Sequence, residues 1–157
     1  MIILGIDPGL NYTGWAVIET AKSSVKFVDC GIINPLSKEH ISKRLFSLYN
    51  GVNQVITKFK PQQVSIEETF VSMNPKGSLH LGYARGVLLM LPALHDLAVF
   101  EYSPNTVKKT VAGSGHASKE QVKAMLKFIM PNMKQNMKDD AIDALSIALC
   151  HFYHKGL

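Results

Sequence analysis

The sequence of 157 residues contains few cysteines and no hydrophobic run long enough to span a membrane. Cys30 and Cys150 lie far apart and neither belongs to a CxxC pair, which argues against a disulfide framework or a zinc ribbon. The longest apolar stretch, residues 87–94, is interrupted by Pro92 and is shorter than the ~20 residues that cross a bilayer. The first residues also lack the basic region of a signal peptide. We therefore expect a soluble, cytoplasmic protein with no membrane partner, folded as a single domain over residues 1–157.

Acidic residues are nearly absent from one long segment. The chain has a formal net charge of +5, and residues 105–138 hold seven lysines but a single acid, Glu120. Lysines spaced along one stretch attract a polyanion and release its counterions. A phosphate backbone is therefore the partner we expect for this segment, with an ordinary solvated helix face as the alternative.

The chain alternates between strand and helix patterns. Three short strands come first and form an antiparallel meander, and the later strands are separated by helices. This order predicts an α/β fold in which a mixed five-stranded sheet is flanked by helices. A polar loop is expected through Asn74, Pro75 and Gly77. The apolar runs predict strands at residues 2–6, 15–18, 27–33, 64–68 and 98–102, and the helical spacing of apolar residues predicts helices at 43–60 and 79–91, followed by helices after the last strand.

Four carboxylates occupy positions that packing alone does not explain. Asp7 ends one apolar strand and Glu67 ends another, at the edge of an α/β sheet where ligand sites gather. Asp140 and Asp143 lie three residues apart on the last helix, where like charges repel. Taken singly, each acid has an ordinary explanation, such as a turn at Asp7. As a group, they predict a functional site.

Small residues indicate how these acids meet. Gly5 and Ser65 each precede a strand acid by two residues, and therefore share a face with it. We expect these positions to admit the Ala-rich last helix and so to bring its two acids against Asp7 and Glu67. The neighbouring Glu68 shares its face with bulkier residues and is expected to point toward another layer.

A carboxylate cluster must either take up protons or bind hard cations. We expect Mg²⁺, with Mn²⁺ as a substitute, and two ions per subunit. Two such ions ~3.5–4 Å apart can activate a water and stabilise the leaving oxygen of a phosphodiester. The candidate catalytic and metal-binding residues are Asp7, Glu67, Asp140 and Asp143.

Five motifs occur in a fixed order along nearly the whole chain: GIDPGLNYTGWAVI, SIEETFVSMNP, LGYARGVLL, YSPNTVKKTVAGSGHASKEQV and DDAIDALSIAL. Together they resemble the RuvC-type Holliday junction resolvases of bacteria. The resemblance implies an RNase H-like fold, a homodimer and metal-dependent paired nicks placed symmetrically across a four-way DNA junction during recombination and repair. It also implies a branch-migration motor as a possible partner.

The resemblance assigns roles to individual residues. The family's four acidic positions fall on the four carboxylates named above. Its base-stacking aromatic falls on Phe70, for which a place in the core is the alternative, and its DNA-contacting lysines fall on Lys108 and Lys119, inside the basic segment. Tyr83 stands where the family commonly has Gln, in the helix that resembles the dimer interface, and is a departure from the pattern.

Three other functions use the same residues. The first is an RNase H-like nuclease that acts on RNA/DNA hybrids or structured RNA. The second is an ATPase or sugar-kinase-like domain, which needs a second domain for which the chain has no room. The third is a catalytically silent junction-binding module.

Three histidines have weaker claims to a role. His151 and His154, three residues apart, suit zinc better than a hard cation and are not expected to bind metal. His116 is expected to contact phosphate or solvent.

Overall fold

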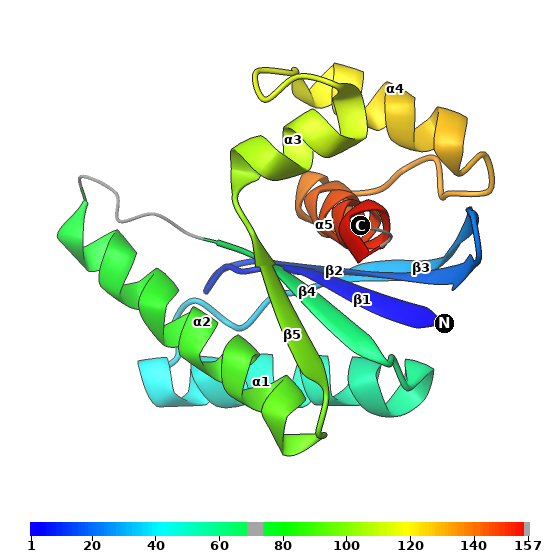
Figure 1. Cartoon of the computed structure of the whole chain (residues 1–157). Coiled ribbons are helices and arrows are strands. Elements are labelled where there is room, and N and C mark those ends of the chain that lie inside the picture. The colour runs from blue at the N-terminus through cyan, green and yellow to red at the C-terminus, as the bar shows by residue number, and fades with distance from the viewer. Residues whose placement is uncertain (69–73, 156–157) are drawn as a thin grey trace.

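The structure, a computed structural model, describes residues 1–68 and 74–155. Its strands form a mixed five-stranded sheet in the order β3-β2-β1-β4-β5 (Figure 1). In chain order the elements are β1 (Ile2–Asp7), β2 (Thr13–Ala21), β3 (Ser24–Ile33), α1 (Ile41–Phe59), β4 (Gln63–Glu67), α2 (Pro75–Leu94), β5 (Ala98–Tyr102), α3 (Pro104–Ala112), α4 (Lys119–Ile129) and α5 (Asp139–Lys155). The first three strands pair antiparallel, whereas β4 and β5 extend the sheet in parallel with β1. The predicted mixed sheet and its opening meander are confirmed.

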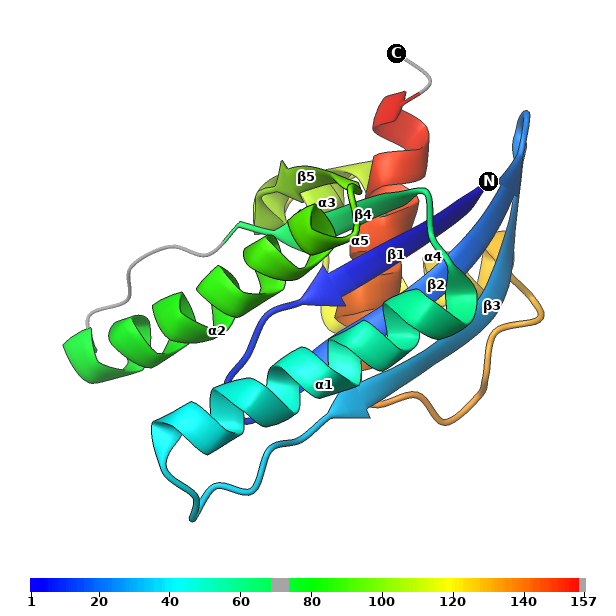
Figure 2. The same cartoon turned by 90° about the horizontal axis from the view of Figure 1, so that it is seen from below.

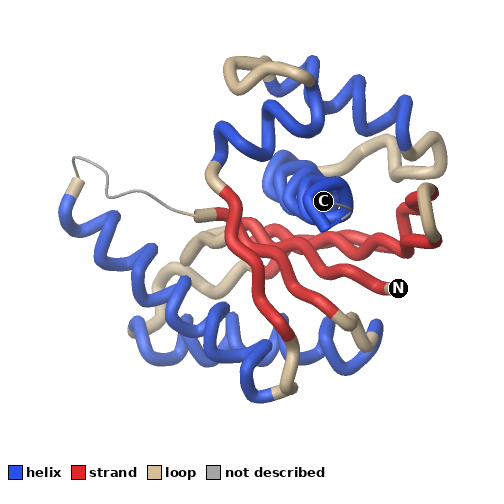
Figure 3. The backbone as a smooth tube through the Cα atoms, in the orientation of Figure 1, coloured by secondary structure: helices blue, strands red, loops and turns tan. Residues whose placement is uncertain are grey.

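Helices cover both faces of this sheet. The pair α1 and α2 lies on one face, and α5 crosses the other face with α3 and α4 beyond it (Figures 1 and 3). Seen from below, α1 and α2 run side by side under the strands (Figure 2). None of the helices in the described part of the chain combines the length and apolarity needed to cross a membrane.

The helix α5 approaches the sheet so closely that only small residues fit between them. A Cβ placed at Gly5 of β1 would lie 2.1 Å from the carbonyl oxygen of Ala144, and one placed at Gly14 of β2 would lie 1.9 Å from that of Asp140. Ser65 of β4 is fully buried. The expectation that small strand residues admit the Ala-rich helix is therefore confirmed.

The second helix begins earlier than the apolar pattern predicts. The expected loop through Asn74, Pro75 and Gly77 is wrong, because Asn74 caps α2 and its side chain accepts a hydrogen bond from the Gly77 backbone N–H. Pro75 occupies the first turn, where a proline costs no hydrogen bond. The first turn of α2 is exposed and polar, so apolar periodicity does not reveal it. The helix also continues through Pro92 to Leu94.

We expect Gly5→Ala to lower the free energy of unfolding by about 1–3 kcal/mol, because the new methyl group meets the α5 backbone. Urea unfolding of the purified protein measures this change. The matched control is Gly115→Ala, whose Cβ would have its nearest neighbour at 3.5 Å, an ordinary contact. Equal stability of the two variants would contradict the close approach of α5 to β1.

Candidate active site

Two of the four predicted carboxylates lie at the ends of neighbouring parallel strands. Ile6 of β1 pairs with Ile66 of β4, so Asp7 and Glu67 follow at the next position of each strand. Adjacent strands lie about 4.8 Å apart, and alternation places both acids on the face that α5 covers. Glu68 continues the ladder by donating its backbone N–H to the carbonyl oxygen of Tyr102 at 2.8 Å, and alternation turns its side chain to the other face of the sheet.

The other two carboxylates come from the first turns of α5. Asp7 pairs across the antiparallel ladder with Gly14, and Gly14 abuts the backbone of Asp140. The side chain of Asp143 follows one turn later on the same helix. The structure thus brings together residues from three separate parts of the sequence at one edge of the sheet.

Burial and mutual repulsion raise the pKa values of three of these acids. Burial raises the pKa of Asp7 from 3.8 to about 8, and the charges of its carboxylate neighbours add to this effect, in the order Glu67, Asp143 and Asp140. Burial and the charge of Asp143 raise the pKa of Glu67 to about 7. Burial also raises the pKa of Asp143, although Lys119 opposes the change. Without a counter-ion, the cluster therefore holds protons that isolated carboxylic acids would release.

The chemistry of this donor set fits a hard divalent cation. All four candidate ligands supply carboxylate oxygen, which Mg²⁺ and Mn²⁺ prefer. Across the described residues, no three His, Cys, Asp or Glu side chains are already arranged around one point as metal ligands. Residues Asp7, Glu67, Asp140 and Asp143 are the ones that would hold the cation.

Beside the acids lies a cavity of about 380 Å³ that is lined by both acidic and basic residues. Glu67 and Asp143 line it, and Lys108 of α3 and Lys119 of α4 stand on its wall. Lys119 also pairs with Asp139 at 3.2 Å, and this hydrogen bond raises the pKa of Lys119. Both lysines expected to contact DNA therefore lie at the carboxylate cluster. Asp7 and Asp140 are not among the lining residues.

Two residues singled out in the sequence, Phe70 and His151, are not part of this carboxylate site as the structure describes it. Phe70 lies outside the described residues. His151 is buried, with its ring nitrogens 2.8 Å from the Tyr102 hydroxyl and 2.9 Å from the Gln63 side-chain oxygen. Its ring also stacks on Phe100, with centroids 4.3 Å apart. His151 therefore joins α5 to the sheet.

Two arginines at the site were missed by the sequence reasoning. Arg85 of α2 donates a hydrogen bond to the backbone carbonyl oxygen of Glu67 at 2.5 Å. Arg44 of α1 is 9% exposed and holds the loop after Asp7, donating to the carbonyl oxygen of Leu10 at 3.2 Å and to the Asn11 side chain at 2.6 Å. An arginine within a largely apolar helix was the available signal for Arg85.

Comparison with known proteins places this geometry in a family. The family model described as "Crossover junction endodeoxyribonuclease RuvC" matches residues 3–151. The chain is 44% identical over 154 residues to the protein of that name from Rhodopseudomonas palustris, covering 98% of this chain and 87% of the relative. It is 46% identical over 154 residues to that of Methylorubrum extorquens, covering 98% and 81%.

Solved structures agree. The RuvC of T. thermophilus in complex with a Holliday junction substrate superposes with a TM-score of 0.92 at 28% identity, covering 99% of this chain and 94% of that one. The yeast mitochondrial resolvase Ydc2 shares the fold with a TM-score of 0.69 at 16% identity. The expected RNase H-like fold is confirmed. The chain belongs to the RuvC family of crossover junction endodeoxyribonucleases.

Proposed function

We propose that this protein resolves four-way DNA junctions by paired symmetric nicks, with Asp7, Glu67, Asp140 and Asp143 as its catalytic residues. The observation that carries the proposal is the gathering of buried carboxylates from three chain segments beside a cavity walled by lysines. The family's printed name and the junction-bound relative from T. thermophilus support the substrate. The active form acts in recombination and repair.

The four carboxylates are the ligands for divalent cations, Mg²⁺ or Mn²⁺, with two ions per subunit. Bound in pairs, such ions would lower the pKa of an attacking water and stabilise the leaving oxygen of the phosphodiester. Burial and the charges of Glu67, Asp143 and Asp140 act together on Asp7, which makes it the acid on which metal binding would depend most. The fit rests on the all-oxygen donor set and on the proton uptake that cations would replace.

The lysines at the cavity wall position the DNA. Lys108 lowers the pKa of Glu67, and Lys119 lowers those of Asp7 and Asp143, so both positive charges act on the same acids. They offset the repulsion between these acids and the approaching phosphates. Phe70 is the residue proposed to stack on a junction base, since exposed stacking is worth about 1–3 kcal/mol.

Two active sites must face opposite strands for paired nicks, which requires a symmetric dimer. An exposed stripe on α2 suits this contact: Leu79, Tyr83 and Met90 are 54%, 43% and 49% exposed. A Cβ placed at Gly82 or Gly86 would have no neighbour within 4 Å. Among the described residues these glycines therefore do not admit a close neighbour, and a second copy is the proposed partner of the stripe.

Three further expectations complete the proposal. The chain acts as a single nuclease domain over residues 1–157, it works in the cytoplasm, and it cooperates with a branch-migration motor. The family resemblance supports the last of these.

Cleavage mapping tests the proposal. An end-labelled mobile four-way junction, incubated with and without Mg²⁺, should receive symmetric, ligatable nicks on opposing strands only when the metal is present. Asp7→Asn should abolish cutting and bind the junction as tightly as the parent or more tightly, because a negative charge facing phosphate is removed. Asp96→Asn, at an exposed turn, is the isosteric control and should cut normally. Cutting of an RNA/DNA hybrid in place of the junction would overturn the substrate, and cutting by Asp7→Asn would overturn the site.

The raised pKa of Asp7 also predicts a pH-dependent stability. The unfolded chain ionises this residue near 3.8 and the folded chain near 8, so the folded, metal-free state binds the extra proton and loses stability as the pH rises between these values. Asp7→Asn removes this loss, and at about pH 8 it should be more stable than the parent by on the order of 1–4 kcal/mol.

Thermal unfolding in EDTA at about pH 4 and about pH 8 measures the difference. The advantage of Asp7→Asn should be small at the lower pH and full at the higher one. Mg²⁺ should stabilise the parent more than the variant at the higher pH. An equal advantage at both pH values would show that Asp7 does not hold the proton.

A further inference from the structure

A row of lysines leads away from the active-site cavity along α4. Lys119, Lys123 and Lys127 are spaced four residues apart, which places them on one face of the helix, about 6 Å from one to the next. The helix begins in a complete capping box, in which Ser118 and Gln121 exchange hydrogen bonds. The three lysines therefore project from a helix whose first turn is well defined.

The row joins two hollows of the surface. Lys123 lines both the active-site cavity and a second cavity of about 520 Å³. The second cavity continues with Lys127 and with the loop after α4, and its lining contains no acid: Pro131, Met133, Gln135 and Asn136 complete it. A polyanion that enters the active-site cavity therefore finds a continuous basic surface on leaving it.

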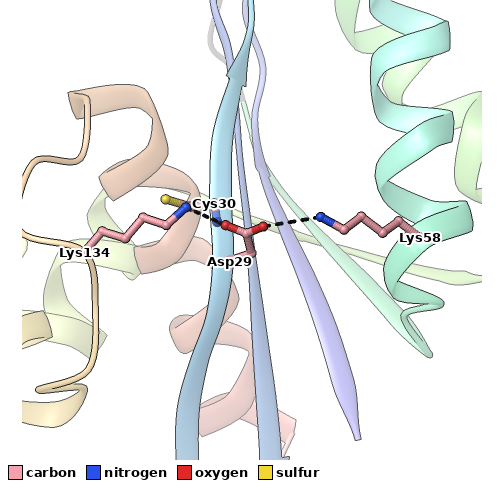
Figure 4. Close-up of polar contacts among 4 residues, drawn as sticks. All are labelled: Asp29, Cys30, Lys58 and Lys134. Atoms are coloured by element: carbon pink, nitrogen blue, oxygen red, sulfur yellow. Dashed lines mark hydrogen bonds and ion pairs between the residues drawn. The ribbon is translucent and has the colours of Figure 1, made fainter.

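Ion pairs distinguish Lys123 and Lys127 from Lys119 of the same row, which pairs with Asp139, and from Lys134 nearby. Lys134 follows in the same basic segment, but Asp29 of β3 holds it at 2.6 Å and also contacts Lys58 of α1 at 3.6 Å (Figure 4). Its charge is therefore partly offset by Asp29 at the edge strand of the sheet. Within the described residues, neither Lys123 nor Lys127 forms an ion pair, so both charges are available to a partner.

We propose that Lys123 and Lys127 bind the backbone of the duplex arm that leaves the active site. The inference rests on the proposed function and extends it beyond the cavity. From Lys119 to Lys127 the helix rises about 12 Å, which matches three to four nucleotides of one strand at about 3.4 Å each. The partner is therefore a short, defined stretch of phosphates next to the cut.

The double variant Lys123→Gln/Lys127→Gln tests this surface. Its junction binding should depend less on salt than that of the parent, with the slope of log K against log[salt] reduced by about 2. Neutral methylphosphonates at the three to four phosphates next to the cut should weaken the parent more than the double variant, which keeps Lys108 and Lys119. The matched control, Lys26→Gln/Lys38→Gln, removes two exposed lysines elsewhere and should behave as the parent.

Other results overturn the inference. An unchanged salt slope, or methylphosphonates that weaken the double variant as much as the parent, would show that the row does not contact this arm. If polyglutamate competes with the parent but DNA binding is unaffected by the variant, the row serves an acidic protein. If the parent fails to cut junctions while the row still sets the salt slope, the proposed function fails and the surface stands.

A separate contact links the proposed dimer helix to a catalytic residue. Arg85 of α2 spans two strands: one guanidinium nitrogen donates to the backbone carbonyl oxygen of Glu67 at 2.5 Å, and another pairs with the carboxylate of Glu101 on β5. The arginine side chain is only 17% exposed. Its planar fork suits two simultaneous acceptors in a way that a lysine ammonium does not.

The geometry assigns Arg85 the role of a positioning residue for Glu67. It stands between Gly82 and Gly86, so the stripe proposed to receive a second copy and the end of β4 are joined through one side chain. Docking of the partner helix would steady α2 and, through Arg85, the backbone of Glu67. The assignment rests on the proposed role of Glu67.

Single-turnover cleavage of a junction by Arg85→Lys separates this role from a merely structural one. The rate should fall by about 10–100-fold, as for other residues that orient ligands, and the Mg²⁺ concentration for half-maximal rate should rise. Junction affinity and the sedimenting dimer should be retained. Lys76→Gln, at the exposed first turn of α2, is the control and should match the parent.

If Arg85→Lys does not fold, Glu101→Gln replaces it, since it loosens the same guanidinium from a half-exposed site, and should show a smaller change of the same kind. A parent-like rate and metal requirement in the folded variant would overturn the role, and so would a loss of binding in step with the rate. If Asp7→Asn cuts as the parent does, the proposed function fails instead.

Discussion

The direct approach of α5 to the sheet is the constraint on which the site depends. At Gly5 and Gly14 the helix backbone lies where a side chain would otherwise stand. Because these strand positions are empty of side chains, the first turns of the helix reach the end of β1, and Asp140 and Asp143 meet Asp7 there. Larger residues would push α5 away from the sheet and separate the carboxylates that the two strands and the helix bring together.

That approach has an electrostatic cost, which is visible in the raised pKa of Asp7 and Glu67. The apolar layers on the two faces of the sheet supply the stability against which this cost is set, since fully buried aliphatic side chains surround β1 on both sides. Local strain of this kind is typical of sites that bind a charged ligand. A cation is the ligand proposed to relieve it here, and the lysines around the cavity supply the positive charge that the proposed phosphate partner needs.

The two helical layers contribute different features to the site. On one face, α2 carries an exposed apolar stripe and, through Arg85, touches the carbonyl oxygen of Glu67. On the other, α3 and α4 carry the basic segment and place Lys108 and Lys119 on the cavity wall. The carboxylates lie between these layers, so the proposed subunit contact and the proposed DNA contact would act on them from opposite sides of the sheet.

By itself, the sequence determined the features that local rules control. Strand alternation selected Glu67 over Glu68, helical spacing placed Asp140 and Asp143 on one face, and small residues at Gly5 and Ser65 foretold the packing of α5. The early start of α2 was not predicted, because its first turn, capped by Asn74, is polar and shows no apolar periodicity. Side-chain contacts between segments distant in the sequence were not predicted either. Only the tertiary structure decided that Arg85 reaches Glu67 and that Lys134, but not Lys123, pairs with Asp29. The partners of a long charged side chain depend on where the fold places its backbone in three dimensions, which no local pattern encodes.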